Sequence, residues 1–421
     1  MGYIKLGFEP DDEHLVVFFR AKSSQPAEKI AEIIAAESSV GTWTEVWTSS
    51  RQIVEKFGAK VFKLRKEKGV VSMAIAYPIG LFEKRSIPQL LSSISGNVFG
   101  VKEADWLVLD DIYLPQKYEK KFPGPKEGME GIRRYLGTTK SRRPHVGTII
   151  KPKLGLSAKK FAEVAEMAWR GGIDFVKDDE NLTDQKFCKF EERVVKTLEA
   201  LDRAEEETGE KKLYSPNITA NADVMLKRAD FVKEHGGNMI MLDLFTCGFS
   251  AVQMVRDQNI LPIHAHRAMH GVFTEGGGNM VKMHVWAKIF RLMGVDQLHI
   301  DHGAGKMHAN KEEVRKQYSS LVERKNGIKP VFPVASGGLY PTKVYDVVNA
   351  FNSTDFVFQG GGGVHGHPQG TEAGAKAMRA AVDAVAEGIT LKEKAKECKE
   401  LAVALEKWGG KQVYYLWHKK I

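Results

Sequence analysis

The stretch that decides the fold is HVGTIIKPKLGLSAKKFAEVAEMAWRGGIDFVKDDE, residues 145–180. Two runs rich in β-branched and aromatic residues, 145–151 and 173–179, flank a segment at 159–170 whose apolar residues recur every three or four positions. This pattern predicts a strand, an amphipathic helix and a second strand. A helix of this length between two strands favours a parallel β-α-β unit.

The same unit continues towards the C-terminus. Further strands are predicted to end near Asn217, Asp243, Arg267, His299, Ser336 and Gly360, and a helix fits each gap, for example at 281–293. Eight β-α repeats predict an α/β fold with a closed (β/α)₈ TIM barrel. Since parallel strands of a barrel end at one face, the polar and glycine residues that end them converge there. An open, doubly wound sheet is the competing fold.

The segment before the barrel has a different pattern. Strands are expected at 14–22, 69–76 and 106–114, and helices at 27–38 and 87–95. This mixture predicts an N-terminal α+β domain of the ferredoxin-like kind. We divide the chain into the α+β domain at 1–116, a linker with a short helix near 129–136 at 117–144, the barrel at 145–390 and a tail at 391–421 with a helix at 391–408.

Composition limits the classes of function. The 421 residues are 43% hydrophobic, and no apolar run approaches the ~20 residues of a membrane span. The cysteines, Cys188, Cys247 and Cys398, lie outside any metal-ligand spacing, which favours a reduced, cytoplasmic protein. The net charge of +9 is spread along the chain, so an anionic phosphosugar is a better partner than nucleic acid.

Four consecutive polar residues, Lys177 to Glu180, follow the apolar start of the second barrel strand. Strand alternation places Lys177 and Asp179 on one face, with Glu180 at the strand end. The two carboxylates suit Mg²⁺, but the ion would repel a lysine ammonium beside them. Reaction of Lys177 with CO₂ would turn it into an anionic carbamate, a third oxygen ligand. The alternative is a solvated run of charges.

Two lysines, Lys151 and Lys153, are predicted on one face at the end of the first barrel strand. A lysine desolvated beside other cations or a metal exchanges protons near neutral pH. A proton-transfer role is therefore expected, against the alternative of two surface lysines.

The fifth strand ends in His264-Ala265-His266-Arg267. An H-x-H pair on a barrel strand can bind Zn²⁺, but in the metal-dependent amidohydrolases that pair lies on the first strand. Arg267 better fits a phosphate clamp, because its planar fork matches phosphate oxygens. His266 is a candidate for moving protons on a sugar hydroxyl, and His299, at the end of the sixth strand, for either task.

Glycine-rich loops follow the last two strands, at 336–338 and 360–363. Their backbone N–H groups can hold a phosphate, as the loops after strands seven and eight of barrels often do. Gly361, Gly363 and Gly366 also match G-x-G-x-x-G, but no later strand carries a ribose-binding acid, so a dinucleotide site is not expected. The loop after strand six, GAGK at 303–306, combines glycines with Lys306, which could close over a substrate.

Together these stretches resemble the large subunit of the ribulose-1,5-bisphosphate carboxylase/oxygenase (RuBisCO) family. The similar stretches are GTIIKPKLGLS at 147–157, GGIDFVKDDEN at 171–181, HAHRAMH at 264–270 and AAESSVGTWTEV at 35–46. The resemblance covers nearly the whole chain. The short C-terminus and GGGGVHGHP at 360–368 are most similar to the archaeal form III branch.

The resemblance implies a Mg²⁺-dependent carboxylase and oxygenase that converts ribulose 1,5-bisphosphate to 3-phosphoglycerate through an enediol. Lys177 would be the carbamylated metal ligand and the base that starts enolisation, and Asp179 and Glu180 would complete the Mg²⁺ site. Lys151 would handle the proton on the reacting carbons, and Lys306 would stabilise the new carboxylate.

Further roles follow from the same resemblance. His266 would assist hydration and proton relay. Arg267 and His299 would hold one phosphate, and Gly361 and Gly362 the other. The remaining substrate contacts would be Lys153, Ser336, Gly337 and Gly338.

In the family, a neighbouring subunit completes the site with residues that correspond to Glu37, Thr42, Trp43 and Asn97. A homodimer is therefore the smallest expected unit, a ring of dimers is compatible with it, and no small subunit or membrane is expected. The form III branch suggests AMP or ribose salvage. A RuBisCO-like enolase or isomerase of the methionine-salvage type is the alternative, and a non-catalytic phosphosugar-binding protein is a third.

The chain departs from the family pattern at one place. The family usually has small residues, often Gly-Thr, after the strand-six histidine, whereas this chain has Ile300, Asp301 and His302. The segment from Lys306 to Ser336 is also shorter than in relatives. Both changes bear on loop closure and on the preference between CO₂ and O₂.

Overall fold

The computed structural model describes residues 2–42, 44, 46–304, 310–324 and 327–409. The chain divides into two compact units. Unit 1 consists of Met1–Gly124, Met269–Met293 and Arg324–Ile328, and unit 2 of Pro125–Ala268, Gly294–Glu323 and Lys329–Ile421. None of the helices in the described residues is long and apolar enough to cross a membrane.

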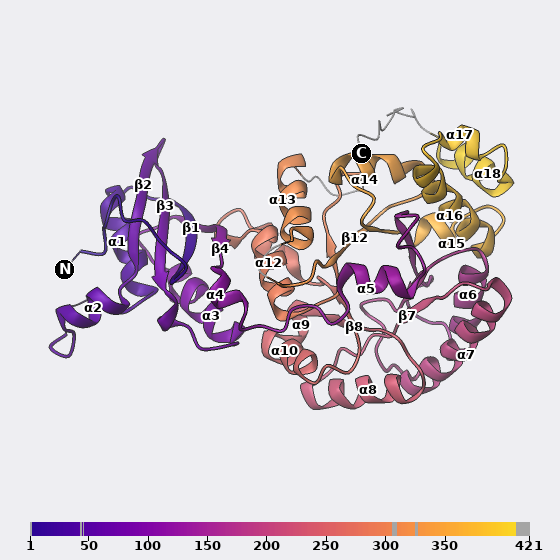
Figure 1. The fold of residues 1–421 in the computed structure, drawn as a ribbon, viewed down its shortest axis with the longest axis horizontal. Helices are drawn as coiled ribbons and strands as arrows, with labels where there is room; N and C mark the ends of the chain where they lie inside the picture. The colour runs from indigo at the N-terminus through magenta and orange to yellow at the C-terminus, as the bar shows by residue number, and fades with distance from the viewer. Residues whose placement is uncertain (1, 43, 45, 305–309, 325–326, 410–421) are drawn as a thin grey trace. The chain divides into compact units, whose positions relative to one another are not determined.

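Unit 1 contains a five-stranded mixed sheet (Figure 1). Its elements run β1 (His14–Lys22), α1 (Ala27–Glu37), α2 (Arg51–Phe57), β2 (Lys60–Glu67), β3 (Val70–Pro78), α3 (Ile87–Ser95), β4 (Trp106–Tyr113) and β10 (Met280–Val281). The strand order β4-β1-β3-β2 with antiparallel pairing is the predicted ferredoxin-like arrangement. Alternate residues of β1, such as Val17 and Phe19, are fully buried and fix its register.

Several elements of unit 1 were not predicted, among them β2, α2 and β10. The strand β2, KVFKLRKE, carries five charged side chains and lies at the sheet edge, so its apolar alternation is weak. The helix α2 buries none of its residues. The two-residue strand β10 pairs in parallel with β4 at the other edge, where Met280 lies opposite Val108, a residue far away in the sequence.

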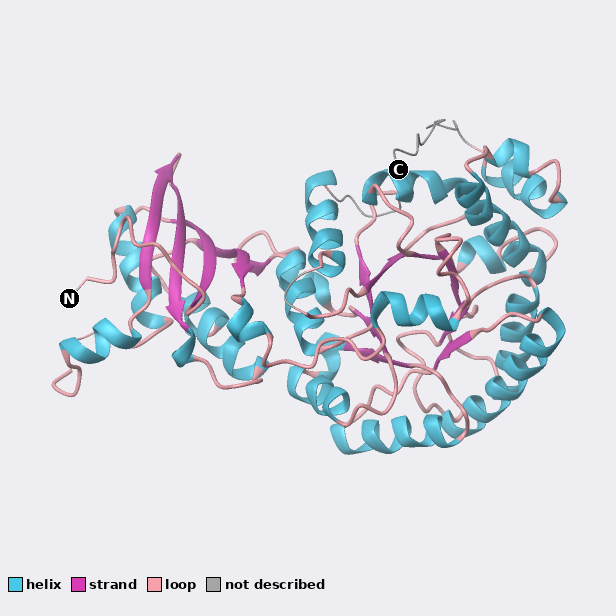
Figure 2. Cartoon of the chain, viewed as in Figure 1, coloured by secondary structure: helices cyan, strands magenta, loops and turns pink. Residues whose placement is uncertain are grey.

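Unit 2 contains the predicted barrel of eight parallel strands (Figure 2). They are β5 (His145–Ile149), β6 (Phe175–Lys177), β7 (Leu213–Ser215), β8 (Ile240–Asp243), β9 (Ile263–His266), β11 (Gln297–Ile300), β12 (Phe332–Ser336) and β13 (Val357–Gln359). The last strand pairs with the first, β13 with β5, which excludes the doubly wound alternative. One bridge, from Asn217 to Met241, joins β7 to β8 and nearly closes the ring.

A helix follows each barrel strand along the chain. These helices are α6 (Ala158–Arg170), α7 (Phe190–Thr208), α8 (Ala222–Glu234), α10 (Phe249–Asp257), α12 (Met283–Met293), α13 (Lys311–Val322), α14 (Val344–Phe351) and α16 (Thr371–Glu387). In α6, the Ser157 side chain accepts the Lys160 N–H and caps the helix, while Phe161, Ala165 and Trp169 are buried along one stripe.

The linker helix, α5 (Gly128–Tyr135), covers the end of the barrel where the strands begin. Its Met129 and Ile132 pack with the first residues of several strands, among them Phe175, Leu213 and Phe332. The opposite end, where the strands finish, is therefore the end that presents polar side chains.

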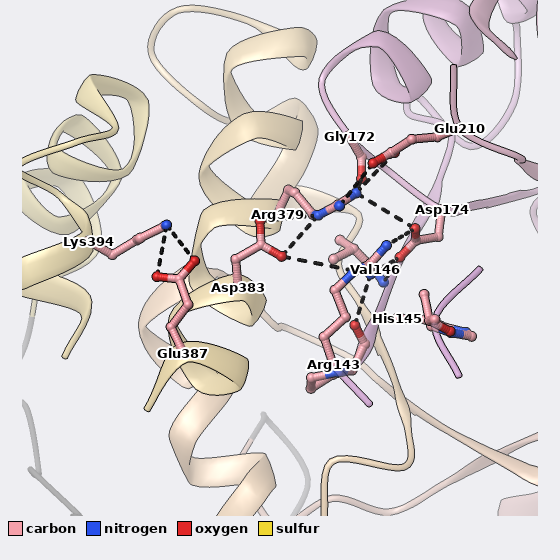
Figure 3. A network of polar contacts seen from close by, with 12 residues as sticks. Arg143, His145, Val146, Gly172, Asp174, Glu210, Arg379, Asp383, Glu387 and Lys394 are labelled. Atoms are coloured by element: carbon pink, nitrogen blue, oxygen red, sulfur yellow. Dashed lines mark hydrogen bonds and ion pairs between the residues drawn. The ribbon is translucent and has the colours of Figure 1, made fainter. Parts of the chain in front are cut away.

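Ion pairs link segments at the strand beginnings (Figure 3). Arg143, before β5, binds both oxygens of Asp174, before β6, at 2.6 Å each. Arg379 of α16 binds both oxygens of Glu210 at 3.1 and 3.0 Å and also pairs with Asp383. These contacts connect the first two β-α units to the last helix of the barrel.

The predicted tail helix at 391–408 is wrong in one respect. It is split into α17 (Leu391–Lys394) and α18 (Lys399–Trp408). In one continuous helix, Leu391 and Leu401 would point about 80° apart, at 3.6 residues per turn. The turn between the two helices allows both leucines to be buried.

Candidate active site

A fully buried lysine lies at the centre of the polar end of the barrel. Lys177 is the last residue of β6, and its Nζ donates to the Asp178 carbonyl at 2.8 Å and contacts the Met241 sulfur at 3.5 Å. The nearest carboxylate oxygen, Glu180 Oε2, is 3.8 Å away. Burial lowers the pKa of the Lys177 ammonium, although the nearby carboxylates oppose that effect. The neutral amine is therefore more accessible here than on an exposed lysine.

Asp179 and Glu180 follow Lys177 directly. Lys151 Nζ donates to Asp179 Oδ2 at 2.9 Å, and the Asn181 side chain donates to Asp179 Oδ1 at 3.0 Å. Burial acts to raise the pKa of both carboxyls. The net effect is nevertheless a lowered pKa, at Asp179 because of the hydrogen bonds from Asn181 and Lys151, and at Glu180 because of the neighbouring charges of His266 and Lys177. Both carboxylates are thus anionic at neutral pH.

Asp178, between Lys177 and Asp179, points the other way. It is fully buried and accepts hydrogen bonds from Arg193 Nε at 3.0 Å, Tyr214 Oη at 2.8 Å and the Asn217 backbone N–H at 2.8 Å. The Asn217 side chain in turn donates to the carbonyls of Asp179 and Glu180. These contacts were not predicted, because the sequence showed only that Asp178 alternates with Lys177 and Asp179 along the strand.

His266, at the end of β9, lies beside two carboxylates. Its Nε2 is 3.7 Å from Glu180 Oε2 and its Nδ1 is 3.4 Å from Asp243 Oδ1. Asp243 ends β8, and its buried Oδ1 has no hydrogen-bond partner within the described part of the chain. An oxygen in that state is suited to accept a proton or bind a water molecule. Sequence reasoning placed Asp243 at a strand end but gave it no role.

A row of hydrogen-bonded, largely buried side chains connects three neighbouring strands of the barrel, β9, β11 and β12. His264 Nδ1 is 2.7 Å from Gln297 Oε1, and His264 Nε2 is 2.9 Å from His299 Nε2. His299 Nδ1 is 2.6 Å from Ser336 Oγ. Both nitrogens of His264 are therefore engaged, so the H-x-H pair does not form a zinc site. The phosphate role expected of His299 would require one of its two hydrogen bonds to break.

Arg267 does not lie free at the strand end. Its Nη2 donates to Asp301 Oδ1 at 2.5 Å, and its buried Nη1 lacks a hydrogen-bond partner among the residues that the structure describes. Asp301 is the residue at which the chain departs from the family pattern.

The two glycine loops have the backbone geometry that glycine permits. Gly337 and Gly338, after β12, both have positive φ, 111° and 73°. After β13, a Cβ on Gly361 would lie 3.0 Å from the Lys151 side chain, so this glycine leaves room for Lys151. The structure thus brings Lys151, Asp179 and the second glycine loop together.

The other predicted residues lie elsewhere or cannot be placed. The first barrel strand ends at Ile149 rather than Lys151, so the argument from alternation does not apply to Lys153, which is exposed in the loop. In unit 1, Asn97 Nδ2 donates to Glu37 Oε1 at 3.1 Å, and Thr42 is exposed. Trp43 and Lys306 lie outside the described residues.

Among the described residues, histidines, cysteines and carboxylates do not form a group of three that could hold a metal ion. Asp179 and Glu180 supply two oxygen donors of the kind that Mg²⁺ prefers. Lys177, if converted to an anion, would supply a third donor from the same strand end. The buried amine beside two carboxylates fits that conversion.

A nearly closed eight-stranded barrel with an N-terminal α+β unit, and with lysines, carboxylates and histidines at the strand ends, defines a class of barrel enzymes whose active site lies at that face. Two family models match the chain: "Ribulose bisphosphate carboxylase large chain, catalytic domain" at residues 128–408 and the corresponding N-terminal domain at residues 2–118. The chain therefore belongs to the ribulose bisphosphate carboxylase (RuBisCO) large-chain family, whose enzymes are carboxy-lyases.

Individual relatives place it with the archaeal type. Ribulose bisphosphate carboxylase of Methanocaldococcus jannaschii is 46% identical over 97% of this chain and 100% of its own length. The octameric enzyme of Pyrococcus horikoshii has a TM-score of 0.92 at 43% identity, covering 97% of both chains. The dimeric enzyme of Hyperthermus butylicus has a TM-score of 0.89 at 41% identity, covering 97% of this chain and 98% of its own.

Proposed function

We propose that this chain carboxylates, and also oxygenates, ribulose 1,5-bisphosphate to give 3-phosphoglycerate, with Mg²⁺ and a carbamate on Lys177. The observation that carries the proposal is the fully buried Lys177 amine, 3.8 Å from Glu180. In the activation step, the neutral amine nitrogen attacks the carbon of CO₂, an N–C bond forms while one C=O π pair moves onto oxygen, and the nitrogen releases one proton to solvent. The product is an anionic carbamate, which supplies the missing oxygen donor.

The carbamate of Lys177, Asp179 and Glu180 would hold Mg²⁺. When bound, the ion supplies a Lewis acid that polarises oxygens of the substrate. The carbamate would then remove the proton next to the substrate carbonyl, which would produce the enediol. Lys151, held by Asp179 at 2.9 Å, is positioned to move a proton at the reacting carbons.

The remaining residues would bind the substrate and stabilise the product. Arg267 would bind one phosphate, and the N–H groups of Gly361 and Gly362 the other. His266, beside Asp243, would pass protons during hydration. Lys306 would stabilise the new carboxylate. Substrate contacts would include Lys153, His299, Ser336, Gly337 and Gly338.

A second copy of the chain would complete the site. Glu37 and Asn97 touch one another in unit 1, which supports a shared role for the group Glu37, Thr42, Trp43 and Asn97. The octameric and dimeric states of the two solved relatives agree with a homodimer as the minimum. We also propose the domain limits given above and, from the form III branch, a place in AMP or ribose salvage.

The carbamate is tested by ¹³C NMR on the enzyme with ¹³C-bicarbonate and Mg²⁺. The expected result is one slowly exchanging carbamate signal that is absent in Lys177→Met. A control, Lys212→Met, removes another buried lysine, whose Nζ lies 2.8 Å from Glu210 Oε2. Lys212 directly precedes β7 and so lies away from the carboxyl ends of the strands, and this variant should keep the signal. Loss of the signal in both variants, or its presence in Lys177→Met, would overturn the assignment.

The reaction products distinguish a carboxylase from the alternative, a RuBisCO-like enolase or isomerase. Labelled bicarbonate and ribulose bisphosphate should give labelled 3-phosphoglycerate if the chain is a carboxylase. Proton exchange on the substrate without incorporation of label would support the enolase instead. Lys306→Ala should keep enolisation and lose carboxylation, whereas equal loss of both steps would contradict its assigned role.

A further inference from the structure

The Arg267 guanidinium is engaged by an internal carboxylate. Nη2 donates to Asp301 Oδ1 at 2.5 Å, with only 10% of the Arg267 side chain and 19% of the Asp301 side chain exposed. Charge-assisted hydrogen bonds of this length are among the stronger ones in proteins. The donors that would meet a phosphate are therefore partly committed before any substrate arrives.

Asp301 is itself fixed in place. Its second oxygen, Oδ2, accepts from Gln317 Nε2 at 2.8 Å, and its backbone N–H donates to Gln317 Oε1 at 3.0 Å. Gln317 is a buried residue of α13, and its amide binds both the side chain and the backbone of Asp301. With one hydrogen bond from Gln317 to its carboxylate and one from its backbone to Gln317, Asp301 does not swing away at little cost, and it stays near Arg267 when another anion enters.

The neighbouring histidine does not restore positive charge to this place. His302 Nε2 is 2.9 Å from the Ser336 carbonyl, and burial lowers the pKa of the His302 ring, so it is neutral at physiological pH. The Arg267–Asp301 pair carries no net charge. A phosphate that binds Arg267 thus meets one guanidinium and, close beside it, one carboxylate of its own sign.

We propose that Asp301 is a specificity-determining residue, whose carboxylate competes with substrate phosphate for Arg267 and weakens the binding of sugar bisphosphates at this subsite. The proposal rests on the phosphate role given to Arg267 above. The unpartnered Nη1 of Arg267, buried at the same place, is a donor that remains for the phosphate among the described contacts of this side chain. Substrate binding then requires the phosphate to share the guanidinium with Asp301 rather than to take all of it.

The test is the Asp301→Asn variant of the full-length enzyme, which keeps the side-chain shape and removes the charge. The expected result is a KM for ribulose 1,5-bisphosphate lower by about tenfold, with kcat changed by less than about twofold, because only binding of the anion is relieved. Inhibition by inorganic sulfate should strengthen in parallel, and more than inhibition by nitrate, since repulsion grows with the charge of the anion.

Asp301→Ser serves as a second variant in case the amide disturbs the Gln317 contacts. The matched control is Asp110→Asn, which removes the carboxylate from another arginine pair, Arg20–Asp110 at 2.7 Å, in unit 1, and should leave KM unchanged. An unchanged or higher KM in both Asp301 variants would overturn the proposal, since it would show that Asp301 only holds Arg267 in position.

A separate variant distinguishes an error in the role of Asp301 from an error in the proposed function. Arg267→Met should raise KM and abolish the difference between sulfate and nitrate. If Arg267→Met leaves KM unchanged, the phosphate role of Arg267 is wrong and the inference falls with it. If Arg267→Met raises KM while the Asp301 variants do not lower it, the proposed function stands and only the role of Asp301 is overturned.

Discussion

His264 and His299 share one hydrogen bond between their Nε2 atoms, at 2.9 Å, in the interior of the barrel. Burial lowers the pKa of both rings well below the usual value, so both are neutral and only one of them can donate. Gln297 Oε1, which can only accept, lies 2.7 Å from His264 Nδ1 and therefore decides which of the two rings donates. With the amide in this orientation, His264 carries its proton on Nδ1, and His299 must donate through Nε2.

The same reasoning fixes the direction of the hydrogen bond between His299 and Ser336. Since His299 uses its Nε2 proton towards His264, its Nδ1 accepts, and the Ser336 hydroxyl, 2.6 Å away, must donate inwards. Ser336 Oγ is then left as an acceptor, as its proposed contact with a sugar hydroxyl requires. Neutron diffraction from hydrogen-deuterium exchanged crystals should find deuterium on His264 Nδ1 and His299 Nε2. Deuterium on the opposite nitrogens would show that the amide and the whole row are reversed.

Gln297→Met should remove the acceptor that orients the row. We expect kcat/KM for the bisphosphate to fall by about tenfold, the size of one oriented hydrogen bond. Gln89→Met is the control, because it deletes a glutamine amide that bonds the Ser93 side chain and the backbone of Glu83 and Leu81 in unit 1, and it should leave kcat/KM unchanged. An equal loss in the two variants would assign the effect to stability rather than to direction.

The Arg143–Asp174 pair at the strand beginnings should contribute strongly to stability. Burial alone would raise the pKa of Asp174, but the charge and hydrogen bonds of Arg143 lower it well below the usual range. Asp174→Asn should reduce the free energy of unfolding at pH 7 by about 3–5 kcal/mol, because a buried arginine loses its counter-charge. The control, Asp383→Asn in the same network, removes a 30% exposed carboxylate and should cost about 1 kcal/mol or less (Figure 3).

The sign of the pH dependence follows from the lowered pKa of Asp174. A carboxyl with a depressed folded-state pKa stabilises the fold fully above its unfolded pKa, about 4, and loses this contribution as the pH falls towards the folded value. The difference between wild type and Asp174→Asn, measured by urea unfolding, should therefore be constant above about pH 5 to 6 and narrow below about pH 4. A difference that widened on acidification would contradict the assignment.

Much of this molecule follows from its sequence. All eight barrel strands, and the strands β1, β3 and β4, could be predicted, because short β-branched runs and turn residues are local signals. Contacts that join distant segments could not be. Asp178 meets Arg193 and Tyr214, and Asp301 meets Gln317, only after the barrel has formed. For Asp301, the sequence showed a departure from the family pattern but not the residues that it contacts.

Two adjacent glycines after β13 should respond differently to alanine. A Cβ on Gly363 would lie 2.3 Å from the Leu339 carbonyl oxygen and 2.7 Å from Tyr340 Cα, whereas a Cβ on Gly362 would have open space around it. Gly363→Ala should therefore cost about 1–3 kcal/mol of stability, because backbone atoms must shift. Gly362→Ala should keep the stability of the wild type, and raise KM only if the added methyl group faces the bound phosphate. Equal stability of the two variants in urea unfolding would contradict the close approach of the Leu339 carbonyl to Gly363.

Asp178 should control metal affinity without being a ligand. Its carboxylate fixes the Asn217 backbone at 2.8 Å, and Asn217 donates to the carbonyls of Asp179 and Glu180. Asp178→Asn should weaken activation by Mg²⁺ by about 10–100-fold, the usual effect of losing a residue that orients metal ligands. Tyr214→Phe, which deletes one hydrogen bond but keeps the charge of Asp178, should have a smaller effect in the same direction. A Mg²⁺ dependence identical to that of the wild type in Asp178→Asn would show that Asp179 and Glu180, the proposed ligand residues, are held in place by the strand alone.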